Sequence, residues 1–119
     1  MNPFYITTAI DYVNSLPHIG TAYEKIAADC IARAKRLLGY DVRFCMGTDE
    51  HSINVKKKAL ESGLDPKSYC DRMAPGFTGI WKKLSISYDD FIRTTEARHV
   101  RGVTALFEKI RDAGDIYSD

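Results

Sequence analysis

The sequence predicts an α/β fold with a three-stranded, mostly parallel sheet and flanking helices, in the order βαβααβα. Two observations lead to this prediction. Short runs of β-branched and aromatic residues alternate with longer segments whose apolar residues recur at helical spacing. One helix joins the first two strands, and such a βαβ unit makes its strands parallel. At 119 residues, the chain has the length of one domain with one core.

The first strand is predicted over residues 4–10, covered on both faces, because its β-branched and aromatic content is nearly continuous. A polar loop over residues 11–17 follows. A long helix is expected over residues 20–38, stopped by Gly39. Its apolar face is expected to include these residues: Ala22, Ile26, Ala27, Cys30, Ile31, Ala34, Leu37 and Leu38.

A second strand is expected over residues 41–47. Thr48 or Asp49 is a candidate cap for the helix that follows it and ends at residues 62–63. Because ligands of open α/β sheets gather at the carboxyl ends of the strands, the polar residues after the first and second strands are expected to form one site.

A third helical segment is expected to begin at Asp65, as cap, and Pro66. A Pro-Gly pair at residues 75–76 is expected to kink this helix or split it in two. A short third strand over residues 91–95 precedes the last helix. That helix carries one apolar stripe, made of Val100, Val103, Leu106, Phe107 and Ile110.

Composition excludes several classes of protein. The formal net charge is +1, so the protein has no strong electrostatic attraction to nucleic acid or membranes. No signal peptide or transmembrane stretch is evident, so we expect a cytoplasmic protein without a membrane partner. Three cysteines and three histidines show no metal-ligand spacing, so we expect no zinc ligands, and the thiols are interpreted as reduced and buried.

The loop before the first helix carries the first candidate site residues. The imidazole N–H of His18 can donate to a phosphate oxygen, and Gly20 lets a nucleotide approach the backbone. The hydroxyl of Thr21 can reach phosphate, and Glu24 can meet a ribose hydroxyl. Each residue also has a simpler explanation. His18 and Thr21 can cap the helix, Gly20 can be an ordinary turn glycine, and Glu24 can lie on a solvated helix face. The junction is also expected to offer unpaired backbone N–H groups to phosphate.

Asp49 is the most informative carboxylate, because it follows a buried strand and precedes a helix. It can bind a substrate ammonium through a charge-assisted hydrogen bond, or cap the helix. Ile10 and Tyr12 can wall a small apolar pocket that Phe77 and Trp81 close, or all four can belong to the core.

Several segments together resemble the class I aminoacyl-tRNA synthetases, and more narrowly the methionyl-tRNA synthetases. The His-Ile-Gly piece alone would indicate only the wider nucleotide-binding superfamily. The matching segments are residues 6–8, 12–14, 17–20, 27–29, 39–42, 47–51, 82–84, 86–89 and 91–95. The resemblance covers essentially the whole chain and implies that residues 1–119 are the N-terminal half of a Rossmann-like nucleotide-binding domain.

The resemblance also implies site residues and a reaction. Methionine and ATP would give methionyl-adenylate and pyrophosphate, with Mg²⁺ accompanying the ATP, and the methionyl group would pass to tRNA. Residues implied to bind ATP are Asn14, His18, Gly20, Thr21 and Glu24, of which His18 and Thr21 are also catalytic. Residues implied to bind the amino acid are Ile10, Tyr12 and Asp49.

The sequence departs from the family pattern in places. Thr21 stands where the motif has a second histidine, and Ala9 and Asp11 replace a more usual proline and tyrosine. The second half of the nucleotide-binding fold and the KMSKS loop are absent, so we expect this chain alone to be inactive or weakly active. A partner or the missing half would cover the exposed sheet edge. The alternative is a stand-alone, non-catalytic module that binds methionine, adenylate or a partner protein.

Overall fold

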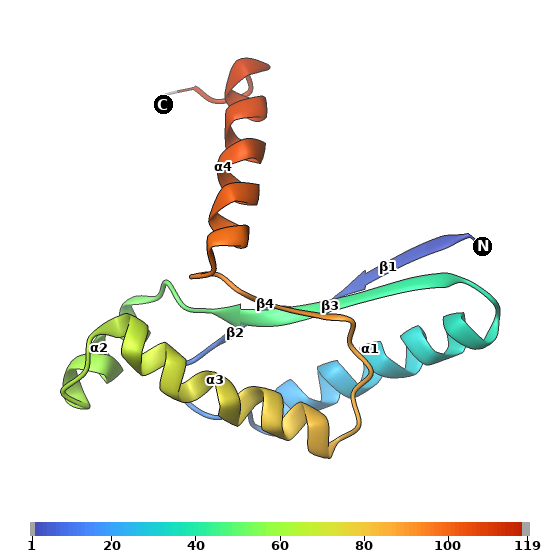
Figure 1. Cartoon of the computed structure of the whole chain (residues 1–119), viewed down its shortest axis with the longest axis horizontal. Coiled ribbons are helices and arrows are strands. Elements are labelled where there is room, and N and C mark those ends of the chain that lie inside the picture. The colour runs from blue at the N-terminus through green and yellow to red at the C-terminus, as the bar shows by residue number, and fades with distance from the viewer. Residues whose placement is uncertain (1, 118–119) are drawn as a thin grey trace.

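The computed structural model describes residues 2–117, and the α/β order predicted from the sequence is confirmed there (Figure 1). The strands are β1 (Pro3–Thr7), β2 (Asp11–Tyr12), β3 (Asp41–Asp49) and β4 (Asp90–Arg93). The helices are α1 (Ile19–Leu37), α2 (Ile53–Glu61), α3 (Pro66–Lys83) and α4 (Ala97–Asp112).

All strand pairs are parallel, and β3 is the central strand. β1 and β2 pair with successive parts of one side of β3, and β4 pairs with its other side. The predicted parallel sheet is therefore confirmed, but it has four strands rather than three, because the short strand β2 lies in the segment predicted as a loop. Thr7 pairs with Cys45, and Asp11 pairs with Thr48. The chain therefore advances four residues from β1 to β2 while β3 advances three. This one-residue bulge is why a continuous strand over residues 4–10 is wrong.

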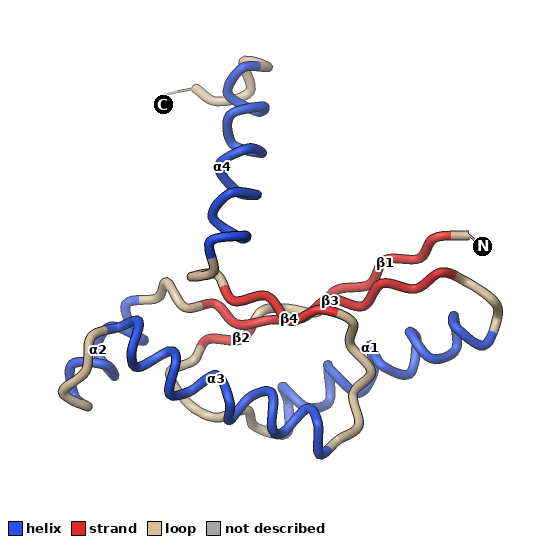
Figure 2. The backbone as a smooth tube through the Cα atoms, in the orientation of Figure 1, coloured by secondary structure: helices blue, strands red, loops and turns tan. Residues whose placement is uncertain are grey.

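The three helices α1, α2 and α3 lie on one side of the sheet, and α4 stands on the other (Figure 2). The core fills the space between the sheet and helices α1, α2 and α3. Its fully buried side chains include Phe44, Met46, Phe77 and Trp81. In β1 burial alternates, and Tyr5 on the outer side is 65% exposed. The expectation that this strand is covered on both faces is wrong, because helices cover only one face in the described part of the chain.

The inward face of α1 differs from the predicted apolar face. Its buried residues are Lys25, Ala28, Asp29 and Ala32. Ile31 is 47% exposed, and Cys30 is exposed rather than buried. Small residues let the helix lie close to the sheet, and two charged side chains on this face find partners there.

Two helix boundaries correct the sequence predictions. α2 is capped by the hydroxyl of Ser52, because β3 runs through Thr48 and Asp49, the two predicted caps. α3 is capped by Asp65 as predicted, but it continues through Pro75 without splitting. Pro75 lies on the exposed side of α3, where water can satisfy the carbonyl that loses its backbone partner.

α4 projects from the sheet and carries the predicted apolar stripe, yet none of its residues is buried (Figure 1). The five stripe residues, Val100, Val103, Leu106, Phe107 and Ile110, are 39–60% exposed. Within residues 2–117, nothing covers this stripe.

Candidate active site

The imidazole of His18 caps the N-terminus of α1. Its Nδ1 accepts hydrogen bonds from the backbone N–H groups of Gly20 at 3.1 Å and Thr21 at 3.4 Å. These two N–H groups are therefore not unpaired, which corrects the expectation that they stand free for phosphate. Because Nδ1 is an acceptor, the hydrogen-bond network assigns the proton of the neutral ring to Nε2. The His18 ring thus offers a donor, its Nε2–H, at this end of the helix.

Gly20 lets the ring adopt this position. A Cβ at residue 20 would lie 3.0 Å from Cε1 and 3.1 Å from Nδ1 of His18. A side chain here would push the imidazole away from the backbone N–H groups that it caps. The glycine therefore supports the histidine directly, in addition to any ligand that approaches the backbone.

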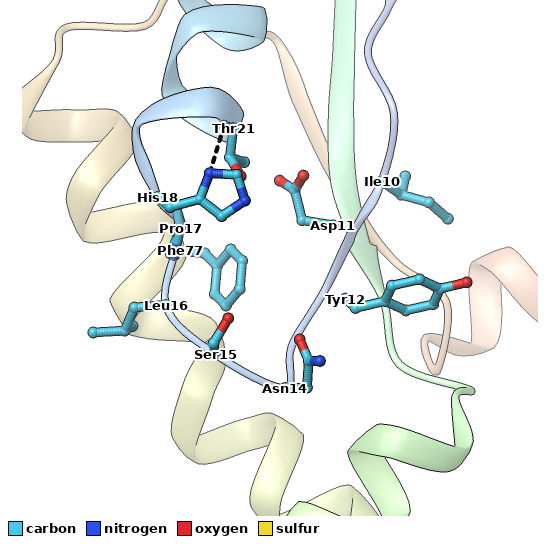
Figure 3. A pocket seen from close by; sticks show the side chains of 10 residues that line it. All are labelled: Ile10, Asp11, Tyr12, Asn14, Ser15, Leu16, Pro17, His18, Thr21 and Phe77. Carbon is cyan, nitrogen blue, oxygen red and sulfur yellow. Dashed lines mark hydrogen bonds between the residues drawn. The ribbon is translucent and has the colours of Figure 1, made fainter.

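The loop after β2 and the start of α1 enclose a cavity of about 250 Å³ (Figure 3). Its lining residues are Ile10, Asp11, Tyr12, Asn14, Ser15, Leu16, Pro17, His18, Thr21 and Phe77. The cavity brings together most residues that the sequence singled out for ATP and for the amino acid. Gly20, Glu24 and Asp49 do not line it.

One edge of the sheet, formed by β1, residues 8–10 and β2 and here called the edge strand, separates two groups of predicted site residues. Asp11 points toward His18, whereas Ile10 and Tyr12 point to the other side of the strand (Figure 3). Tyr12 pairs in register with Asp49, so these two side chains share one face of the sheet at its carboxyl end. This is the face that α1, α2 and α3 leave open. The residues predicted to bind the amino acid thus lie together on the open face.

Asp49 does not cap α2. Its Oδ1 accepts a hydrogen bond from the backbone N–H of His51 at 3.1 Å, which shapes the turn after β3. The helix cap comes from Ser52. Asp49 is only partly buried at the carboxyl end of the sheet.

A buried charge cluster beneath the cavity escaped the sequence analysis. The ammonium of Lys25 is fully buried and donates to Asp11 Oδ1 at 3.1 Å, Glu24 Oε2 at 2.8 Å and the Ala9 carbonyl at 2.8 Å. Glu24 also accepts from the Ala9 N–H at 2.9 Å, so both of its carboxylate oxygens have partners within the chain. A lysine among the small residues of one helix face was the only local signal, and its partners lie in another element.

Burial and the ammonium of Lys25 act on both carboxyls of this cluster. Burial raises the pKa of Asp11 above its ordinary value, and the hydrogen bond from Lys25 only partly offsets this. Burial acts in the same direction on Glu24, but hydrogen bonds from Lys25 and Ala9 outweigh it and lower the pKa of that carboxyl. Oδ2 of Asp11 is buried without a hydrogen-bond partner.

A second buried network holds the carboxyl ends of β3 and β4 together. The Glu50 side chain is fully buried and binds Arg93 through two hydrogen bonds, at 2.7 and 3.1 Å. Arg93 also contacts Asp71 of α3 at 2.7 Å. The hydrogen bond from Arg93 to Glu50 is the main reason that the pKa of Arg93 is raised. Glu50 follows Asp49 directly, so this network fixes the strand end that presents Asp49.

Neither a metal site nor a membrane span appears in the described part of the chain. Among residues 2–117, no group of three or more His, Cys, Asp and Glu side chains is placed to hold a metal ion. No helix there has the length and hydropathy to cross a membrane.

Comparison with known proteins decides the family. The family model described as "tRNA synthetases class I (M)" matches residues 4–119. The chain belongs to this family. Among curated relatives in this synthetase family, the methionine–tRNA ligase of Deinococcus radiodurans is 54% identical over 96% of the chain, and that of Thermosynechococcus vestitus is 51% identical over 98%. The resemblance identified from the sequence is confirmed.

Solved structures of class I synthetases agree with the fold. Mycobacterium tuberculosis methionyl-tRNA synthetase, in complex with methionyl-adenylate, matches the whole chain with a TM-score of 0.94 and 48% identity. The chain spans 23% of that protein, and 17% and 22% of the two curated relatives. It therefore corresponds to about a fifth of the length of the synthetases that it matches.

Proposed function

We propose that residues 1–119 form the N-terminal half of the nucleotide-binding domain of a methionine–tRNA ligase. In the first reaction a carboxylate oxygen of methionine attacks the α-phosphorus of ATP. The bond to the bridging oxygen breaks, and pyrophosphate leaves as methionyl-adenylate forms. The observation that supports this most directly is the 48% identity, over the whole chain, to a synthetase solved with methionyl-adenylate.

ATP is proposed to bind at the start of α1. The Nε2–H of His18 donates to a phosphate oxygen as negative charge develops there, and the Thr21 hydroxyl adds a second donor. Asn14 lines the same cavity, and Gly20 keeps the imidazole in place. Glu24 is proposed to contact a ribose hydroxyl of ATP. Its two carboxylate oxygens also accept hydrogen bonds from Lys25 and from the N–H of Ala9.

Methionine is proposed to bind on the open face of the sheet. The carboxylate of Asp49 pairs with the α-ammonium, and Ile10 and Tyr12 provide apolar surface beside it. The carboxylate of methionine then points across the edge strand toward the ATP site. The location of Asp49 next to Tyr12 at the carboxyl end of the sheet supports this arrangement.

The remaining partners follow from the same proposal. Mg²⁺ accompanies the phosphates of ATP, tRNA receives the methionyl group, and the protein works in the cytoplasm. The rest of the catalytic domain covers the open sheet edge. The alternative, a non-catalytic module, is less favoured, because the relatives named above are methionine–tRNA ligases.

Methionine-dependent ATP–pyrophosphate exchange tests the proposal in the full-length protein that carries these residues. Asp49→Asn is expected to raise the KM for methionine about tenfold or more, since it removes a charge-assisted hydrogen bond, and to leave the KM for ATP nearly unchanged. Glu61→Gln removes an exposed carboxylate at the end of α2 and serves as the control. Exchange that needs no methionine, or an Asp49→Asn variant with unchanged kinetics, would refute the proposal. Residues 1–119 alone are expected to show little or no exchange.

A further inference from the structure

Lys25 is a buried titratable group to which the proposed reaction assigns no role. Its ammonium has three N–H groups, and each has an acceptor in the chain: Ala9 O, Asp11 Oδ1 and Glu24 Oε2. A fully buried ammonium is costly unless it is paired in this way. Two of the acceptors lie 16 and 14 residues away: Ala9 is in the segment between β1 and β2, and Asp11 is in β2.

These contacts converge on the bulge between β1 and β2. Residues 8–10 pair with no strand, and the register with β3 slips by one residue across them. The bulge thus lacks the ladder hydrogen bonds that hold an ordinary edge strand. Lys25 donates to the carbonyl of Ala9, and Glu24 accepts from the N–H of Ala9, so α1 replaces the missing ladder hydrogen bonds at both backbone polar groups of this residue.

The bulge decides which way the next side chains face. Because the register slips here, Asp11 points toward His18, and Ile10 and Tyr12 point to the open face (Figure 3). We propose that Lys25 is a positioning residue: it fixes the bulge and thereby places Ile10 and Tyr12 beside Asp49. The kinetic consequence of this role rests on the proposed function, whereas the structural consequence does not.

Removing the ammonium leaves Asp11 and Glu24 close together without their shared cation. Their mutual repulsion and the loss of three hydrogen bonds release residues 8–11 from α1. The cap at His18 depends on none of these contacts, so the start of α1 stays in place. Binding of the amino acid is therefore expected to weaken more than binding of ATP.

The test compares Lys25→Met, which keeps an apolar stem of similar length, with Asp29→Asn as the matched control. Asp29 is another buried charged residue of α1, and it binds Ser87 and Arg33 rather than the bulge. In ATP–pyrophosphate exchange by the full-length protein, Lys25→Met is expected to raise the KM for methionine about tenfold. The KM for ATP is expected to rise by a clearly smaller factor, because Glu24 is the one proposed ATP residue that contacts Lys25. Asp29→Asn is expected to change neither. Asp11→Asn, which removes one partner, is expected to shift the KM for methionine in the same direction by less.

Amide hydrogen exchange gives a second readout that does not depend on activity. Peptides that contain residues 8–12 are expected to exchange faster in Lys25→Met, and peptides from the middle of α1 to stay unchanged. Unchanged exchange at the bulge would overturn the proposal. So would equal changes in both KM values, or a shift in methionine KM for Asp29→Asn, because each indicates general loss of stability. If the wild-type protein lacks ATP–pyrophosphate exchange, the proposed function fails, and hydrogen exchange alone decides whether Lys25 holds the bulge.

Discussion

The imidazole of His18 uses its two nitrogens for different purposes. Nδ1 accepts from the first turn of α1, and Nε2 is left as a donor on the side of the cavity. The cap therefore sets both the tautomer and the orientation of the ring before any ligand arrives. Such preorganisation is what a group needs if it is to stabilise charge that develops during a reaction.

Two substitutions separate these purposes. His18→Asn keeps a good capping acceptor, so the free energy of unfolding is expected to change by less than about 0.5 kcal/mol, whereas His18→Ala is expected to lose about 1 kcal/mol. Both variants lack the imidazole donor, so both are expected to slow ATP–pyrophosphate exchange about 10²-fold or more. Urea unfolding and exchange kinetics measure the two effects. An active His18→Asn variant would show that the imidazole donor is dispensable.

The sequence predicted the residues whose chemistry is local. His18, Gly20 and Thr21 stand within four positions at a strand-to-helix junction, and the structure places them together. It did not predict Asp11 and Lys25, because their contact crosses 14 residues and depends on a bulge that no local pattern marks. A buried lysine is also rare enough that a solvated position is the ordinary expectation.

At the level of elements, hydrophobic periodicity located α1 but indicated the wrong face. Ile26 and Ile31 are 41% and 47% exposed, whereas Ala28 and Ala32 pack inward with Lys25. α1 has apolar residues on more than one side, so periodicity alone cannot show which side meets the sheet. β3 was predicted well except for its end, since Thr48 and Asp49 have strand partners on β2.

Gly47 allows β3 and β4 to approach each other. A Cβ at this position would lie 2.0 Å from the backbone oxygen of Ile92. Gly47→Ala is therefore expected to reduce the free energy of unfolding by at least the ~1–3 kcal/mol typical of overpacking, because backbone cannot move aside cheaply. Gly79→Ala in α3 is the control, since its Cβ meets no atom within 4 Å. It is expected to stabilise the protein by up to about 1 kcal/mol. A harmless Gly47→Ala would contradict the close strand contact.

Asp29 joins α1 to the turn before β4, and this contact is expected to depend on pH. Burial by itself raises the pKa of this carboxyl, but hydrogen bonds from Ser87 and Arg33 outweigh it, so the pKa lies below its usual 3.8. A lowered pKa means that the stabilisation is complete above the unfolded value and is lost as pH falls through the folded value. Asp29→Asn is expected to cost about 1–3 kcal/mol at pH 7, and the difference from wild type is expected to shrink below pH 3.8. Urea unfolding across this range measures it, and a difference that grows toward acid would refute the assignment.

At the scale of the whole molecule, the sheet is covered on one face, and the candidate site uses both faces. The side chains of His18 and Asp11 lie on the α1 side of the sheet, whereas Tyr12 and Asp49 occupy the open side. A ligand that contacts residues on both faces must therefore pass around the carboxyl end of the sheet. This agrees with the rule that open α/β sheets bind ligands beyond the ends of their strands.

The stripe on α4 gives the last prediction. Leu106 and Phe107 are 60% and 52% exposed and pack against no covering element in the described part of the chain. In the 119-residue chain, Leu106→Lys with Phe107→Lys is therefore expected to leave the free energy of unfolding within about 0.5 kcal/mol, since no buried contact is lost. Binding of the dye ANS is expected to fall, because exposed apolar surface is removed. The control is Trp81→Ala, which empties a fully buried site and is expected to cost about 3–5 kcal/mol. If the α4 double variant loses stability comparable to that of Trp81→Ala, the stripe must pack against this same chain, and the open arrangement of α4 would be wrong.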